Sequence, residues 1–179
     1  MRIFCIAIWC TALLGSSGCE SAKRPTPALE QSTATASKTQ QQSDELKRAI
    51  ETLRSTGAEL EQNSAGLVTG VDMGDVEVTD TLATQIALLD GLQKLTIGES
   101  AMTTVGWQKL GKLTNLQHLD LRDCPLNNEQ LSAVLGELSK LKALRLNGTS
   151  GRTTVDDSGL AGLVNCPELK VLAIDGLLA

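Results

Sequence analysis

Aromatic residues are almost missing from this chain. Its 179 residues include no tyrosine, one phenylalanine and two tryptophans, and the only histidine is His118. The hydrophobic residues make up 41% of the sequence, so any core must be aliphatic. A single histidine excludes a metal site with several histidine ligands, and it limits catalysis that depends on histidine.

Basic residues are also fewer than acidic ones. Lysine and arginine together number 16 against 21 acidic residues, which gives a net charge of -5. Nucleic-acid binding needs a basic face, and this acidic balance argues against it. The abundant residue is leucine, and the length favours a single domain.

The N-terminus has the composition of an export signal. Arg2 gives a short positive start, and the apolar run over residues 3–14 is too short to span a bilayer comfortably. We therefore expect residues 1–18 to be a signal peptide and the protein to be exported.

The string "LLGSSGC" spans the end of the expected signal and closes with Cys19, the first residue after it. This string resembles a bacterial lipobox, which implies that Cys19 is lipidated and tethers the protein to a membrane of the cell envelope. Ser16 departs from the usual pattern, in which a leucine or similar residue is found. The alternative is ordinary signal cleavage with an incidental cysteine.

Residues 19–42 contain serine, threonine, alanine and glutamine with two prolines and almost no large apolar side chain. Such a composition buries too little apolar surface to offset the entropy of ordering the chain. We expect a disordered tether here, so that contact with the membrane comes only through the lipid.

An internal repeat occupies residues 68–179. The strings "LVTGVDM", "GLQKLTI", "NLQHLDL", "KLKALRL" and "ELKVLAI" share apolar residues at relative positions 1, 4 and 6, counted from the second letter of each string, which is Leu92 in the second copy. Alternation of apolar and polar residues predicts a short strand in each copy, and a later three-residue periodicity predicts a helical segment. The sequence therefore predicts an α/β fold with about five short parallel strands, because stacked units share one core.

The third copy also carries the pattern L-x-x-L-x-L-x-x-N/C-x-L, with its residues at Leu116, Leu119, Leu121, Cys124 and Leu126. This pattern resembles the leucine-rich repeat family. The string "VEVTDTLATQIALLDGL" further resembles the variety found in exported leucine-rich repeat proteins of Planctomycetes-type bacteria. The resemblance implies a solenoid with its helical segments on the convex side.

Residues 43–67 are expected to cap the repeats. Ser43 is a plausible N-cap, and Leu46, Ala49, Ile50 and Leu53 share one helical face. A strand "AELEQ", a turn "NSAG" and the returning strand "LVTGVDM" predict a hairpin. No comparable cap follows the last repeat, so we expect its edge to fray or to self-associate.

Two cysteines fall within the repeats. Cys124 lies directly after a strand and Cys166 lies in a helical column, at opposite ends of a unit. We expect both thiols to be free and buried, although an exported compartment would permit a disulfide. Trp107 also lies in a core column.

The polar residues beside the inward leucines are expected on the concave face of the sheet. They form the candidate partner-binding site, which comprises Lys94, His118, Asp120, Arg122, Arg145 and Asn147. An acid near a histidine invites a catalytic interpretation, but no nucleophile or second acid is placed to complete a mechanism. Plain solvated surface is the other alternative. We expect Leu119 to be buried and Asp120 to be exposed.

The sequence thus predicts a non-catalytic protein–protein interaction module without cofactor or metal, exposed at the cell envelope and binding an unidentified protein. The alternative is a truncated copy of a longer leucine-rich repeat protein, with no independent activity and with self-association through its C-terminal repeat.

Overall fold

The computed structural model describes residues 30–122 and 124–177, and the expected signal peptide and Cys19 lie outside these residues. Its strands are β1 (Glu59–Gln62), β2 (Val68–Val78), β3 (Lys94–Ser100), β4 (His118–Arg122), β5 (Ala143–Asn147) and β6 (Val171–Asp175). Its helices are α1 (Glu30–Ser55), α2 (Asp80–Ile86), α3 (Thr104–Leu110), α4 (Asn128–Leu135) and α5 (Asp157–Leu160), followed by the 3-10 helix η1 (Ala161–Asn165).

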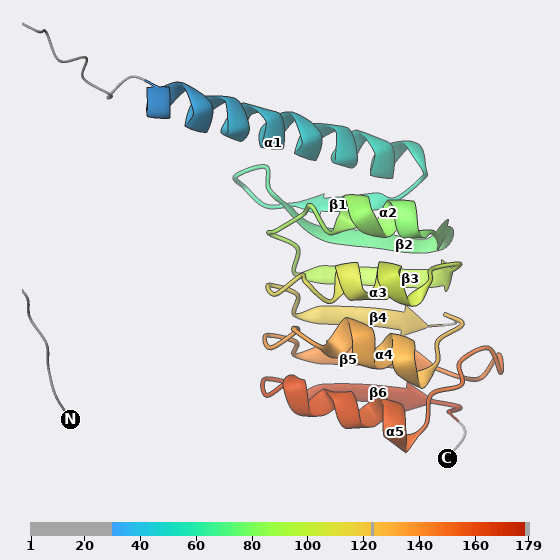
Figure 1. Ribbon diagram of the computed structural model, residues 1–179. Helices are drawn as coiled ribbons and strands as arrows, with labels where there is room; N and C mark the ends of the chain where they lie inside the picture. Colours follow the sequence, from blue (N-terminus) through green and yellow to red (C-terminus); the bar gives the residue numbers. More distant parts are fainter. Residues whose placement is uncertain (1–29, 123, 178–179) are drawn as a thin grey trace, which may run out of the picture.

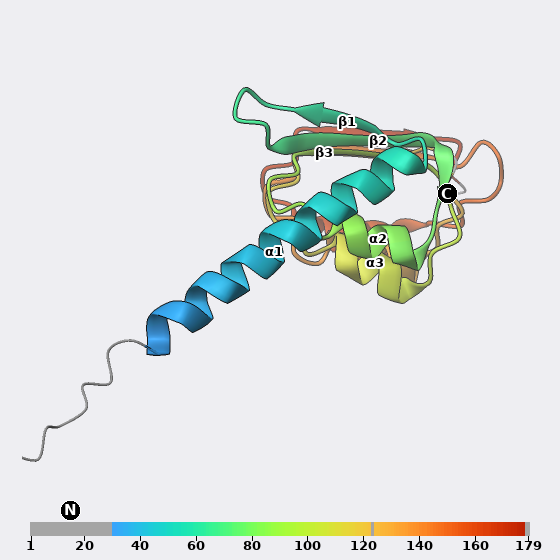
Figure 2. The same ribbon diagram turned by 90° about the horizontal axis from the view of Figure 1, so that it is seen from above.

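The fold is mixed α/β, with a six-stranded and mostly parallel sheet in the order β1 to β6. The prediction of five parallel strands is confirmed by β2–β6, and β1 pairs antiparallel with β2. Each strand from β2 to β5 is followed by a short helix, and these helices line up along one face of the sheet (Figure 1). The opposite face carries no helix among the described residues (Figure 2).

The strand register matches the repeat columns. The Cα partners run from Val71 to Leu95, Leu119, Leu144 and Leu172 across successive strands. Leu119 is 1% exposed and Leu144 is fully buried, so the second apolar position of the repeat points into the core as predicted. Period-two alternation fixes this result, because a slip of one residue would turn every leucine outward.

The helical layer closes the core from the other side. Trp107 on α3 is fully buried, as predicted, together with Ile86, Leu110 and Val134. The helices begin at polar N-cap side chains: Thr79 accepts from the Leu82 amide, and Asn127 forms a capping box with Gln130. Short helices need such caps, since only one or two turns supply their own hydrogen bonds.

The helix and the hairpin expected over residues 43–67 are both present. The hairpin forms as expected, and α1 lies across the end of the core between the sheet and α2 (Figures 1 and 2). Ala49 and Leu53 are fully buried, and Leu46 and Ile50 pack against the core. The helix therefore covers apolar surface that would otherwise face water.

The expected start of α1 at Ser43 is wrong. The helix begins at Glu30, and the Ser43 hydroxyl donates to the carbonyl of Gln40 at 2.8 Å within it. The expectation of disorder is thus wrong for residues 30–42. That segment contains neither proline nor glycine, so nothing in it interrupts a helix. It extends a helix that is already anchored at Ala49, and the free-energy cost of adding a residue to an existing helix is far lower than that of nucleating a new turn.

The end of β2 contains an irregularity that the repeat pattern does not reveal. Between the pairs Met73–Ile97 and Glu77–Glu99, β2 contributes three residues where β3 contributes only Gly98. Gly98 lies directly beside the backbone of Gly74, and a Cβ at position 98 would overlap the Gly74 carbonyl oxygen. Glycine is therefore required for the strands to approach each other here.

Gly98→Ala should lower the free energy of unfolding by about 1–3 kcal/mol, because the added methyl forces the backbone of two paired strands apart. Urea denaturation measures this loss. Gly136→Ala is the matched control, since a Cβ there would meet no atom closer than 3.8 Å and the residue has a helical φ of −53°. The control should leave stability unchanged or raise it by up to about 1 kcal/mol. Equal losses from both variants would contradict the crowding at Gly98.

The last strand is less covered than the others, as predicted. Val171 is 50% exposed, Leu172 is 41% exposed and Ile174 is 40% exposed. Leu172 occupies the same column as the buried Leu119 and Leu144. The apolar edge of the core thus reaches the surface at β6.

Both cysteines of the repeats are buried and neither forms a disulfide among the described residues, as predicted. The Cys124 thiol donates to the Ile97 carbonyl of the preceding repeat at 3.1 Å. Burial raises the pKa of the Cys166 thiol. Within residues 30–122 and 124–177, no helix has both the length and the apolar character needed to cross a membrane.

Candidate functional site: the open face of the sheet

The side of the sheet opposite the helices is called here the open face. The expected concave-face residues Lys94, His118, Asp120, Arg122, Arg145 and Asn147 come from β3, β4 and β5. Along this row of the sheet, Lys94 lies beside His118 and His118 lies beside Ala143, and one step further along the strands Asp120 lies beside Arg145. The parallel register therefore brings residues about 25 positions apart in sequence into one group.

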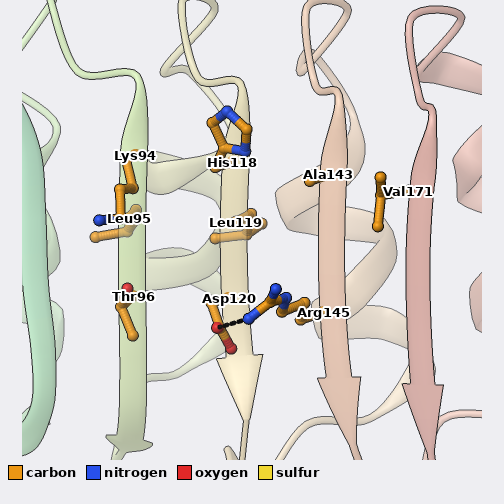
Figure 3. Close-up of a pocket in the computed structure, with 9 residues that line it drawn as sticks. All are labelled: Lys94, Leu95, Thr96, His118, Leu119, Asp120, Ala143, Arg145 and Val171. Atoms are coloured by element: carbon orange, nitrogen blue, oxygen red, sulfur yellow. Dashed lines mark ion pairs between the residues drawn. The ribbon is translucent and has the colours of Figure 1, made fainter.

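A hollow of about 420 Å³ lies at the centre of the open face (Figure 3). It is lined by residues of four neighbouring strands: Lys94, Leu95, Thr96, His118, Leu119, Asp120, Ala143, Arg145 and Val171. Four of the six predicted residues line it. Small and apolar side chains at Ala143 and Val171 leave the space that the charged side chains surround.

Asp120 is enclosed by two arginines. Its Oδ1 lies 2.9 Å from Arg122 Nε, and its Oδ2 lies 3.7 Å from Arg145 Nη1. The Asp120 side chain is only 16% exposed, so the expectation of an exposed residue is wrong. The strand register explains this low exposure. Arg122 follows Asp120 on the same strand and Arg145 lies opposite it on the next strand, so the carboxylate is attracted into the space between the two guanidinium groups.

Replacing Asp120 with alanine should lower the free energy of unfolding by about 0.5–1.5 kcal/mol, more than an isolated surface pair contributes. The loss should shrink at high salt, since the arginines are partly exposed and screened. Urea denaturation at two salt concentrations measures both effects. Asp90→Ala is the control, because that residue is exposed and its effect should stay within about 0.5 kcal/mol. A loss at Asp120 equal to that at Asp90 would contradict the two-arginine contact.

Lys94 forms an ion pair that sequence reasoning missed. Its Nζ lies 2.8 Å from Oε1 of Glu61 on β1, and this hydrogen bond raises the pKa of Lys94. The Glu61 side chain reaches Lys94 across Gly70, where a Cβ would meet it at 2.7 Å. The predicted hairpin contained the information needed to find this ion pair. Glu61 pairs with Gly70, and Gly70 pairs with Lys94, so the two charged residues lie on either side of a glycine.

The hydrogen bonds of Asn147 are made within the loop that follows β5. Its Oδ1 accepts a hydrogen bond from the Thr149 amide at 2.8 Å, and its carbonyl accepts one from the Thr153 hydroxyl at 2.9 Å. These bonds build the loop that follows β5. Within the same loop, Arg152 donates to Glu99 at 2.9 Å, which ties the loop to the end of β3.

The site offers charge and hydrogen bonding rather than a set of metal ligands. In the part of the chain that the structure describes, no three histidine, cysteine, aspartate or glutamate residues are grouped to hold a metal ion. The carboxylate of Asp120 is bound by Arg122 and Arg145. The hollow therefore presents the side chains of Lys94, His118 and Arg145 around a small apolar floor.

No model of a known protein family matches this chain, and no curated protein is similar to it.

Proposed function

We propose that this chain is a non-catalytic protein-binding module of the leucine-rich repeat type, exported to the bacterial cell envelope and anchored there by a lipid on Cys19. Its partner would bind the open face of the sheet. Each part of the proposal rests on a different observation.

The repeat type is supported by the strand register and by Cys124. Five parallel strands align the same repeat position from Val71 to Leu172, and a short helix follows each of the first four. The Cys124 thiol bonds the carbonyl of Ile97, one repeat earlier. The N/C position of the family pattern calls for a side chain with a polar atom, placed just after the strand, that can hydrogen-bond to the neighbouring unit. Cys124 meets that description.

The observation that carries the binding proposal is the hollow on the open face. It gathers side chains from four strands, and its rim holds the guanidinium of Arg145, whose side chain is 56% exposed. Arginine is enriched where proteins bind one another, because its planar group donates several hydrogen bonds at once. The sheet offers the partner a rigid platform, since β3, β4 and β5 each pair with a neighbouring strand on both sides.

The tether is supported by the geometry of α1. This helix has 26 residues and extends well beyond the rest of the described chain (Figure 2). At a rise of 1.5 Å per residue its length is about 39 Å. A helix of this length that begins soon after Cys19 would hold the open face away from the membrane surface.

Affinity capture from detergent extracts of the native envelope tests the binding proposal. The bait is the full chain, compared with Arg145→Glu and with Arg54→Glu, which reverses an exposed arginine on α1 instead. A discrete protein should be enriched by the natural chain and by Arg54→Glu. Its recovery should fall about tenfold or more with Arg145→Glu, as expected for a buried arginine at an interface.

The proposal is overturned if Arg145→Glu captures the same proteins as the natural chain in the same amounts. It is also overturned if every enriched protein is lost equally with Arg54→Glu, since charge alone would then explain capture. Circular dichroism of each bait establishes that both variants are folded.

A further inference from the structure

The edge strand β6 differs from the edge at the other end of the sheet. β1 has four residues, two of them glutamates, and such short charged edges resist pairing with other chains. β6 instead has the sequence Val-Leu-Ala-Ile-Asp, and all five residues are exposed. An exposed apolar edge strand is a template for another strand.

Two backbone hydrogen bonds show which groups of β6 face β5 and which face the outer edge of the sheet. The Val171 amide donates to the Lys142 carbonyl at 3.0 Å, and the Asp175 carbonyl accepts from the Gly148 amide at 2.7 Å. Both groups point toward β5. Because backbone groups alternate sides along a strand, the amides and carbonyls of Leu172 and Ile174 point to the outer edge.

These positions are self-complementary about Ala173. A second β6 running antiparallel, with a two-fold axis at Ala173, places Leu172 of one copy opposite Ile174 of the other. This is a hydrogen-bonded pair, since both residues direct their amide and carbonyl outward, and it occurs twice. The register also uses the whole length of the strand, because Val171 then faces Asp175.

The exposure of the β6 side chains favours the same pairing as the backbone groups do. Leu172 and Ile174 lie in the inward columns, next to Leu144 and Leu146, yet they are 41% and 40% exposed. Pairing across the axis would cover them with each other. The two helical layers would lie on the same side of the joined sheet, which brings the η1 segments, each with Val164 83% exposed, toward the junction.

We propose that a second copy of this chain binds along β6 through this antiparallel, two-fold pairing, which joins the two six-stranded sheets into one. The open faces of the two copies then become one continuous surface. This proposal does not depend on the partner proposed for the open face, because β6 association is measured on the purified chain alone.

Complementary charges test the register. Leu172→Glu and Ile174→Lys each place one charge against an apolar residue of the second copy. Either variant alone should raise the dimer dissociation constant by about 30-fold or more, the loss expected at a strong interface position. A mixture of the two variants should form a heterodimer, since the carboxylate introduced in one chain then meets the ammonium group introduced in the other.

Sedimentation velocity over a range of concentrations measures association. Every sample carries Cys19→Ala, so that a lipid cannot drive it, and mass spectrometry establishes the length of the purified chain. Leu67→Glu is the matched control, because Leu67 is 47% exposed in the turn between β1 and β2 and should leave the dimer intact. Circular dichroism shows whether each variant is folded.

A cysteine at the axis supplies a second test that leaves the core-facing residues unchanged. In the proposed pairing the two Ala173 residues form a non-hydrogen-bonded pair with Cα atoms about 4.5 Å apart, within disulfide range. Ala173→Cys should therefore form a disulfide-linked dimer under mild oxidation. Val105→Cys, at a residue 55% exposed on α3, should not.

The proposal is overturned if the chain that carries only Cys19→Ala remains a monomer at about 100 µM, a concentration that would detect even a weak interface. It is also overturned if a dimer forms but the mixed charge variants do not associate and Ala173→Cys does not cross-link, because the dimer would then use another surface.

Discussion

Leu119→Ala should lower the free energy of unfolding by about 2–5 kcal/mol, the range for removing a fully buried leucine side chain. Leu119 is 1% exposed and lies between Leu95 and Leu144 on the neighbouring strands. The cavity left behind cannot collapse easily, because both flanking strands are held by the register of the whole sheet. A typical protein is stable by about 5–15 kcal/mol, so this single change removes much of the margin.

Urea denaturation of the natural chain and the variant measures this loss, with the denaturant slope as a check that the same transition is compared. Val105→Ala is the matched control: it also shortens an aliphatic side chain, but one that is 55% exposed. Its effect should stay within about 0.5 kcal/mol. A loss at Leu119 no larger than that at Val105 would mean that the strand faces are assigned wrongly.

Cys19→Ala should move the protein from the membrane fraction to the soluble fraction. The proposed anchor is the lipid alone, and acyl chains bind a bilayer with about 0.8 kcal/mol per buried methylene. Among the described residues no helix could replace it by crossing the membrane. Removing the thiol that carries the lipid should therefore remove nearly all membrane binding.

Fractionation of cells expressing each chain, followed by immunoblotting, measures this change. Cys5→Ala is the matched control, because it makes the same substitution inside the apolar run that is expected to be cleaved off. It should leave the protein in the membrane fraction. Membrane association that persists in Cys19→Ala would contradict the lipid anchor, and intact-mass measurement of both proteins would show whether any lipid is attached.

The strand faces, the parallel order and the hairpin could be predicted because each depends on a short-range pattern. Leu116, Leu119 and Leu121 repeat what Leu92, Leu95 and Ile97 do one unit earlier, and aligning the copies already gives the observed register. An apolar residue at the same position of every unit can be buried only if the units stack in order. The grouping of Lys94, His118, Asp120 and Arg145 followed from the same alignment.

The remaining features depend on contacts that the repeat does not encode. The enclosure of Asp120 arises because Arg122 and Arg145 reach it from two directions, and side-chain conformation follows from three-dimensional neighbours. Gly98 is required by a local irregularity in β2, where two strands approach closely. Residues 30–42 are helical because α1 is anchored further along, at Ala49 and Leu53. Local pattern thus determined which residues face the core, whereas tertiary packing decided which charges meet, how closely backbones approach and how far a helix extends.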